Sequence, residues 1–124
     1  MVVGEVNVGK TCLVSRMLGK PMPERTMNTI GVEFGTKNLS LKDNRISVKV
    51  QLWDTAGLEK YRAIVVSHYR RTKGCMVVYS VADRSSFDAV KNHIEQAREN
   101  ADEELNIVVV GNKVDLVERD PTAR

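Results

Sequence analysis

The sequence predicts an α/β fold in which a mostly parallel sheet is covered by helices on both faces. Three observations support this prediction. Short apolar runs alternate with segments of helical periodicity along the 124 residues. Two of the runs, residues 75–81 and 105–110, are almost continuously apolar, as is typical of strands buried on both faces. A segment containing two glycines, residues 4–11, joins the first apolar run to the first helical segment.

The N-terminal half predicts a strand, a helix and a hairpin. Residues 1–3 form a short apolar strand. Residues 10–18 carry apolar pairs at i,i+4 spacing and are followed by Gly19, a common helix stop signal. Residues 37–42 and 46–53 alternate apolar and polar side chains around a polar turn, which predicts an antiparallel hairpin.

The C-terminal half predicts a strand, a helix and a further strand. Ser85 and Asp88 predict a capping box at the start of the helix that follows residues 75–81. The expected buried face of that helix contains Phe87, Val90, Ile94 and Ala97. Ligands of such sheets bind beyond the carboxyl ends of the strands. The functional residues are therefore expected in the loops that follow positions 3, 53 and 110.

The composition fits one domain over residues 1–124, with 42% hydrophobic and 28% charged residues. A net charge of +3 is too small to indicate nucleic acid as a partner. No apolar run approaches the 18 residues of a membrane span. Cys12 and Cys75 lack the spacing of metal ligands. We therefore expect a reduced, cytoplasmic protein.

Residues 4–11, Gly-Glu-Val-Asn-Val-Gly-Lys-Thr, match the phosphate-loop motif G-x-x-x-x-G-K-[ST] in full. The backbone N–H groups of such a loop, with the helix N-terminus behind them, surround an anion. Lys10 is expected to reach the β- and γ-phosphates, and the Thr11 hydroxyl to bind Mg²⁺. Asn7 tolerates left-handed backbone geometry. The β-branched Val6 projects toward the region where the γ-phosphate is attacked.

Two further motifs follow predicted strands. In Trp-Asp-Thr-Ala-Gly, Asp54 is placed to hold Mg²⁺ through water, and Gly57 lets a backbone N–H approach the γ-phosphate. In Asn-Lys-Val-Asp, residues 112–115, the Asp115 carboxylate can accept from N1–H and the 2-amino group of guanine, a donor pair that adenine lacks. The Lys113 stem can pack along the base. Three motifs in this order predict a guanine-nucleotide site.

With these motifs, the whole chain resembles the Rab branch of the Ras-superfamily small GTPases. The resemblance is carried by residues 29–34, 49–53, 59–62, 68–70 and 78–81. Residues 61–64 are most similar to the recycling-endosome Rabs. The resemblance implies a three-layer P-loop NTPase sandwich, mostly parallel with one antiparallel hairpin strand. Residues 1–124 would form a single, incomplete G domain from which the family's last strand and helix are absent.

The resemblance also implies functional roles and partners. Residues 26–34 and 57–70 would be two switches, ordered by the γ-phosphate, that engage effectors, exchange factors and GTPase-activating proteins. The apolar surface read by effectors would consist of Ile30, Phe34, Trp53 and Tyr69. For Trp53, a role as a simple core aromatic remains open. The protein is expected to be a monomer located peripherally on endosomal or Golgi membranes through a prenylated tail that this chain does not contain.

Motifs and resemblance together define the expected site. The residues expected to contact the nucleotide are Glu5, Val6, Asn7, Val8, Gly9, Lys10, Thr11, Cys12, Gly57, Asn112, Lys113, Asp115 and Leu116. Those expected to act in catalysis are Lys10, Thr29, Gly57 and Leu58, where Leu58 replaces the family's Gln. The expected Mg²⁺ ligands are Thr11, Thr29 and Asp54, with GTP or GDP as the bound nucleotide.

Four features depart from the family pattern. Leu58 cannot orient the attacking water, and bulk at Val6 hinders the attack, so hydrolysis is expected to be slow or defective. Met22 replaces an aromatic residue that packs against guanine, and the family's last guanine-contact loop is absent. Three functions therefore stay open: a slow GTPase that switches vesicle traffic, a platform that binds effectors without turnover, and an inactive fragment.

Overall fold

The computed structural model describes residues 1–20, 32–43, 45–55, 62–101 and 104–119. Their strands form one five-stranded sheet in the order β2-β3-β1-β4-β5. The strands are β1 (Val2–Gly4), β2 (Val32–Leu41), β3 (Ile46–Thr55), β4 (Gly74–Ser80) and β5 (Asn106–Asn112). The helices are α1 (Lys10–Met17), α2 (Arg62–His68), the 3₁₀ turn η2 (Tyr69–Arg71), α3 (Arg84–Asp88), α4 (Val90–Asn100) and α5 (Val114–Arg119).

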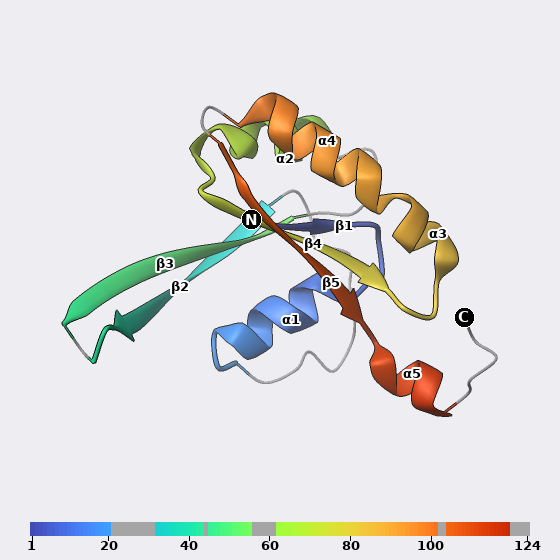
Figure 1. Cartoon of the computed structure of the whole chain (residues 1–124), viewed down its shortest axis with the longest axis horizontal. Coiled ribbons are helices and arrows are strands. Elements are labelled where there is room, and N and C mark those ends of the chain that lie inside the picture. The colour runs from blue at the N-terminus through green and yellow to red at the C-terminus, as the bar shows by residue number, and fades with distance from the viewer. Residues whose placement is uncertain (21–31, 44, 56–61, 102–103, 120–124) are drawn as a thin grey trace.

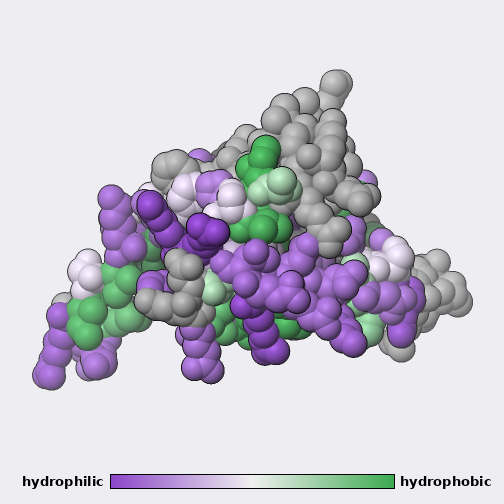
Figure 2. Space-filling model, turned by 90° about the horizontal axis from the view of Figure 1, so that it is seen from above, coloured by the Kyte–Doolittle hydropathy of each residue, from purple (hydrophilic) through white to green (hydrophobic). Residues whose placement is uncertain are grey.

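The topology confirms the predicted α/β class. β1 runs parallel to both β3 and β4, and β4 runs parallel to β5, whereas β2 is antiparallel to β3. Helix α1 covers one face of the sheet, and α2, α3 and α4 cover the other (Figure 1). The side of the molecule formed by the second group of helices is largely hydrophilic (Figure 2). The three-layer, mostly parallel sheet with one antiparallel pair is therefore as expected.

The hairpin is longer than the side-chain alternation predicts. β2 begins at Val32 instead of position 37, and β3 continues to Thr55. Continuous backbone pairing from Val32↔Thr55 to Leu41↔Ile46 explains the difference, because a ladder does not require apolar alternation. Near the turn, Leu41 and Ile46 are exposed, since this end of the hairpin extends beyond the core.

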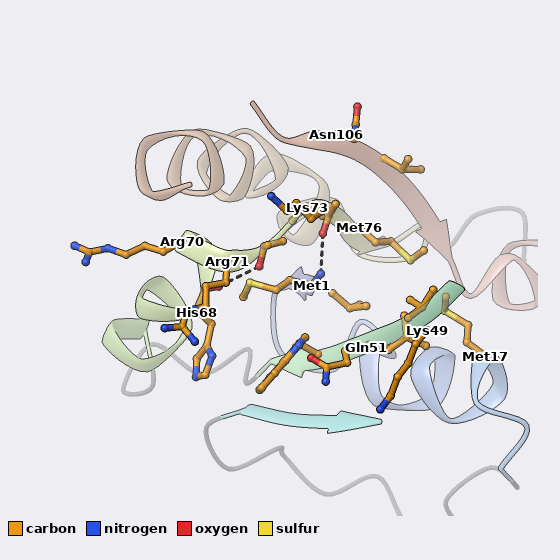
Figure 3. Close-up of a pocket in the computed structure, with 18 of the residues that line it drawn as sticks. Met1, Met17, Lys49, Gln51, His68, Arg70, Arg71, Lys73, Met76 and Asn106 are labelled. Carbon is orange, nitrogen blue, oxygen red and sulfur yellow. Dashed lines mark hydrogen bonds between the residues drawn. The ribbon is translucent and has the colours of Figure 1, made fainter. Parts of the chain in front are cut away.

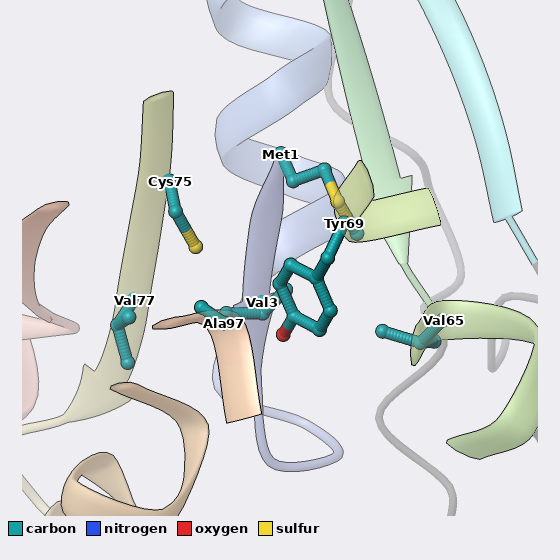
Figure 4. Packing of buried hydrophobic residues seen from close by; sticks show 7 residues of the cluster. All are labelled: Met1, Val3, Val65, Tyr69, Cys75, Val77 and Ala97. Carbon is teal, nitrogen blue, oxygen red and sulfur yellow. The ribbon is translucent and has the colours of Figure 1, made fainter. Parts of the chain in front are cut away.

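Two groups of apolar side chains form the core, one on each face of the sheet. The cluster between the sheet and helices α2 and α4 contains Met1, Val3, Val65, Tyr69, Cys75, Val77 and Ala97 (Figure 4). Tyr69 has no exposed surface, so its predicted place on an effector-binding surface is wrong. Its ring fills the space between α4 and β1, and burial raises the pKa of its hydroxyl.

The start of the helical segment after β4 differs from the predicted capping box. Asp83 is the N-cap residue, and its carboxylate accepts a hydrogen bond of 3.0 Å from the Ser85 N–H. Ser85 therefore lies inside α3, which ends at Ala89, where α4 begins. Phe87 does not lie in the core as predicted: it is 43% exposed, and its ring has an edge contact with Tyr79. The other predicted core residues of this segment, Val90, Ile94 and Ala97, do pack in the core.

Strand β5 is not buried on both faces as predicted. Val108 is 59% exposed and Val109 is 46% exposed. β5 is an edge strand in the described sheet, and its only pairing there is with β4. The apolar run correctly predicted a strand, but a run alone does not show whether a helix covers each face.

A cavity of about 1100 Å³ lies at the amino end of β1, between β3 and β4. Its lining includes Met1, Lys49, Gln51, His68, Arg71, Lys73 and Met76 (Figure 3). It arises because β1 pairs with β3 at a single position, Val2↔Asp54, so the first part of β3 has a strand on one side only. The cavity is at the end of the sheet opposite the phosphate loop.

No helix among the described residues is long and apolar enough to cross a bilayer.

Candidate nucleotide-binding site

The phosphate loop connects the end of β1 to the start of α1, as the motif predicts. Its backbone needs three unusual conformations: φ is 152° at Gly4, 66° at Asn7 and 97° at Gly9. A Cβ atom at Gly4 would collide with the Val78 carbonyl oxygen. The expectation that Asn7 accepts left-handed geometry is confirmed. Glycine and asparagine therefore allow the chain to turn sharply between the sheet and the helix.

Lys10 is the buried cation of this loop, with 6% of its surface exposed. Its Nζ donates to the carbonyl oxygens of Gly4 at 2.9 Å and Glu5 at 2.6 Å. Burial lowers the pKa of Lys10 to about 8, although the nearby carboxylates of Asp54 and Glu5 act in the opposite direction. A buried positive charge inside an anion-binding loop favours binding of a polyphosphate.

Thr11 and Asp54 bring two hard oxygen ligands together beside the loop. Thr11 lies in the first turn of α1, and Asp54 lies near the carboxyl end of β3. The Thr11 hydroxyl donates to Asp54 Oδ2 at 2.6 Å, and Asp54 is 4% exposed. A hydroxyl and a carboxylate fit the preference of Mg²⁺ for oxygen ligands. The donor set on these two elements is therefore compatible with the predicted metal site.

The Asn-Lys-Val-Asp motif is attached directly to the phosphate loop. Asn112 ends β5, and its Nδ2 donates to the Val8 carbonyl oxygen at 2.8 Å. Lys113 Nζ donates to the Asn7 carbonyl oxygen at 2.6 Å. A Cβ atom at Gly9 would collide with Asn112 Nδ2, so this contact requires glycine there.

Other predicted nucleotide contacts surround these loops. Asp115 and Leu116 lie in the first turn of α5, and both are exposed. Cys12 is half-buried in α1, and Val6 is half-buried in the phosphate loop. Thr29, Gly57, Leu58 and Met22 lie outside the described residues, as do Ile30, most of the first predicted switch and residues 57–61 of the second.

Two histidine contacts were not predicted from the sequence. The rings of Trp53 and His68 stack at a centroid distance of 5.1 Å and an interplanar angle of 33°. Position 68 falls within the predicted second switch, but no sequence signal indicates its contact with Trp53. His93 Nε2 lies 3.1 Å from Glu5 Oε1 in the phosphate loop. No sequence signal indicates this pair, because 88 residues separate its members.

A phosphate loop at the end of β1, a Thr–Asp oxygen pair and an Asn-Lys-x-Asp motif are the features of a P-loop fold with a candidate nucleotide site. The Ras family model matches residues 1–123. The chain therefore belongs to the Ras family.

Similar proteins agree with this assignment. The chain is 45% identical to Ras-related protein Rab-11B of Dictyostelium discoideum, over 95% of this chain and 53% of that protein. It is 42% identical to GTP-binding protein ypt3 of Schizosaccharomyces pombe, over 94% and 54% respectively. It is 45% identical to Ras-related protein RABA3 of Arabidopsis thaliana, over 94% and 48%. The chain thus spans about half the length of the curated relatives it matches.

Proposed function

We propose that this chain binds GTP or GDP with Mg²⁺ and acts as a Rab-type switch in vesicle traffic. The observation that carries the proposal is the direct attachment of the Asn-Lys-Val-Asp motif to the phosphate loop. Two hydrogen bonds, from Asn112 to Val8 and from Lys113 to Asn7, hold the expected base and phosphate sites at a fixed separation. A single ligand that carries both a base and a polyphosphate fits this arrangement.

In this proposal each described residue has a distinct task. Lys10 and the loop N–H groups neutralise the phosphates, and the Lys113 stem supports the base. Asp115 selects guanine through its carboxylate. Thr11 and Asp54 would hold Mg²⁺, directly or through water, together with Thr29. When bound, the metal supplies positive charge to the phosphate oxygens.

A titration with a fluorescent guanine nucleotide tests this function. We expect saturable binding that weakens when Mg²⁺ is removed and that is not displaced by ATP. Asp115→Ala should reduce the preference for guanine over adenine by roughly tenfold or more. The variant lacks the charge-assisted contact between the Asp115 carboxylate and guanine, which contributes about 1.5–3 kcal/mol. Glu99→Ala, which removes an exposed carboxylate from α4, is the matched control. A folded chain that prefers ATP, or binds neither nucleotide, would refute the proposal.

We further propose that hydrolysis is impaired. Leucine at position 58 offers no donor or acceptor to the attacking water, and Val6 adds bulk to the loop. Acceleration by activating proteins in this class, roughly 10³–10⁵-fold, depends on the geometry of that water. Single-turnover hydrolysis should therefore rise in the double variant Leu58→Gln with Val6→Gly. If the rate does not change while nucleotide binding persists, the impairment has another cause.

The second candidate function is a platform that binds effectors without turnover, and Leu58 and Val6 favour it. Partners would use residues 26–34 and 57–70. Trp53 contacts His68 of the second segment through their tilted rings, and both side chains are half-buried. In this function the protein would act at the surface of endomembranes. Tight GTP retention without phosphate release would support this function over that of a slow GTPase.

A further inference from the structure

The phosphate loop contains a carboxylate whose partner is a histidine on the other side of the sheet. Glu5 is the first residue after β1, and His93 lies on α4. Glu5 Oε1 and His93 Nε2 are 3.1 Å apart. The two side chains are 42% and 20% exposed, so the contact lies at the margin of the protein where solvent reaches it. This is the ion pair through which α4 contacts the loop in the described structure.

A negative charge at Glu5 opposes the proposed ligand. The backbone carbonyl oxygen of Glu5 also accepts a hydrogen bond from Lys10 Nζ at 2.6 Å. The carboxylate is thus close to the group that is expected to meet the phosphates, and it acts electrostatically on Lys10. Like charges a few Å apart repel, and the repulsion is reduced when an opposite charge neutralises one of them. A protonated histidine beside Glu5 does this, whereas a neutral one does not.

We propose that His93 is a positioning residue for the phosphate loop. It orients the Glu5 side chain and, when protonated, offsets its charge, so that guanine nucleotide binds more tightly as pH falls. The inference rests on the proposed function, because it concerns the affinity of the same site. Helix α4, which contains none of the predicted nucleotide contacts, thus regulates the electrostatics of the phosphate loop.

The other ionisable groups near this pair do not account for such a pH dependence between pH 5.5 and 7.5. Lys10, with a pKa lowered to about 8, loses part of its charge only near pH 7.5, and this loss is common to the wild type and His93→Gln, so it cancels in their comparison. On α3, Arg84 and Asp88 pair with each other at 3.1 Å. On α4, Lys91 and Glu95 pair at 3.9 Å. On the neighbouring η2 and β4, Tyr69 and Cys75 stay neutral because burial raises the pKa of both groups.

The test measures the dissociation constant of a fluorescent GDP analogue with Mg²⁺ at intervals from pH 5.5 to 7.5. Four variants of the full chain are compared with the wild type. His93→Gln keeps a hydrogen-bonding side chain but no titratable charge, and His93→Arg keeps a fixed positive charge. Glu5→Gln removes the carboxylate. Glu95→Gln removes an exposed carboxylate from the same helix and is the matched control.

We expect wild-type affinity to rise about two- to fivefold more between pH 7.5 and 5.5 than that of His93→Gln, as befits a partly exposed ion pair. His93→Arg and Glu5→Gln should both bind at pH 7.5 as tightly as the wild type does at low pH. Glu95→Gln should follow the wild-type profile. Protonation of the nucleotide's own phosphates affects all five proteins equally and cancels in the comparison.

The results separate this inference from the function on which it rests. If the wild type binds guanine nucleotide but all five pH profiles coincide, the inference is overturned and the proposed function stands. If the folded wild type binds no guanine nucleotide, both are overturned. A purely structural role for His93 would lower the affinity of both His93→Gln and His93→Arg equally at every pH, which also contradicts the inference. Thermal unfolding of each variant at pH 7.5 verifies that the proteins compared are folded.

Discussion

Binding of a polyphosphate should draw a proton onto Lys10 at alkaline pH. In the free protein, burial lowers the pKa of Lys10 to about 8 from its ordinary value of 10.5. Phosphate oxygens beside Nζ stabilise the charged form, so the pKa in the complex should return to the ordinary value or exceed it. A rise in pH from 7 to 9 should therefore remove the proton from Lys10 in the free protein but not in the complex.

The size of this effect follows from the two pKa values. With a free pKa of about 8, roughly one tenth of Lys10 is neutral at pH 7, about half at pH 8 and about nine tenths at pH 9. Binding should therefore take up about 0.1, 0.5 and 0.9 proton at these three pH values. Affinity should fall about tenfold between pH 7 and 9, or about 1.4 kcal/mol.

Isothermal titration calorimetry with GDP in two buffers of different ionisation enthalpy measures this proton uptake. The phosphates of the nucleotide are almost fully ionised above pH 7.5, so they contribute little to it. Lys91→Met, which removes an exposed lysine of α4, should leave the uptake unchanged. Proton uptake near zero at both pH 8 and pH 9 would refute the argument, because it would mean that Lys10 is already fully protonated in the free loop.

Three further predictions follow from described contacts. Gly9→Ala should weaken guanine-nucleotide binding at least tenfold in a fluorescence titration, because φ is 97° and the added Cβ would meet Asn112. Ser86→Ala should lower the free energy of unfolding by about 1–3 kcal/mol in urea, because the Ser80 N–H loses its buried acceptor at 2.9 Å. Burial raises the pKa of Cys75 from 9.0 to about 11. The stabilising contribution of the buried thiol is therefore complete below pH 9 and should be lost between pH 9 and 11. Unfolding of Cys75→Ala and the wild type at alkaline pH measures this loss.

Each of these three predictions has a contrary result. Unchanged affinity in Gly9→Ala would mean that the two loops can separate without cost. Unchanged stability in Ser86→Ala would mean that water replaces the lost hydroxyl. If wild type and Cys75→Ala lose stability over the same alkaline range and by the same amount, the buried thiol does not control that range.

Local signals in the sequence predicted the fold and the loops. They did not predict which side chains become buried by contacts with residues far away in the sequence. The phosphate loop was recognised because its physics depends on eight consecutive residues, and the strands because apolar runs and alternation are local patterns. Tyr69 was misplaced because an aromatic residue within a predicted switch gives no local sign of which way its ring points. Phe87 was misplaced because a helical wheel assumes one continuous helix, whereas the structure has two helices that meet at Ala89.

The candidate site shows the same division. The roles expected of Lys10, Thr11 and Asp54 come from motifs. In the structure the Thr11 hydroxyl donates to Asp54, and Lys10 is buried close enough to Asp54 to interact with it electrostatically. The contact between His93 and Glu5 has no motif, because it depends on where α4 crosses the end of β1. Pairs of this kind become visible only when the helices have been packed on the sheet.

The contacts between the phosphate loop and residues 112–113 also determine when the site can form during synthesis. Asn112 and Val8 are separated by 104 positions, and Lys113 and Asn7 by 106. Closing so long a loop costs conformational entropy that local structure does not repay, so such contacts form late. On a translating ribosome, the phosphate loop is synthesised before residues 112–113 and must wait for them to emerge before its proposed base-binding partner exists. The nascent chain should therefore be unable to retain guanine nucleotide until β5 has been released from the exit tunnel and has paired with β4.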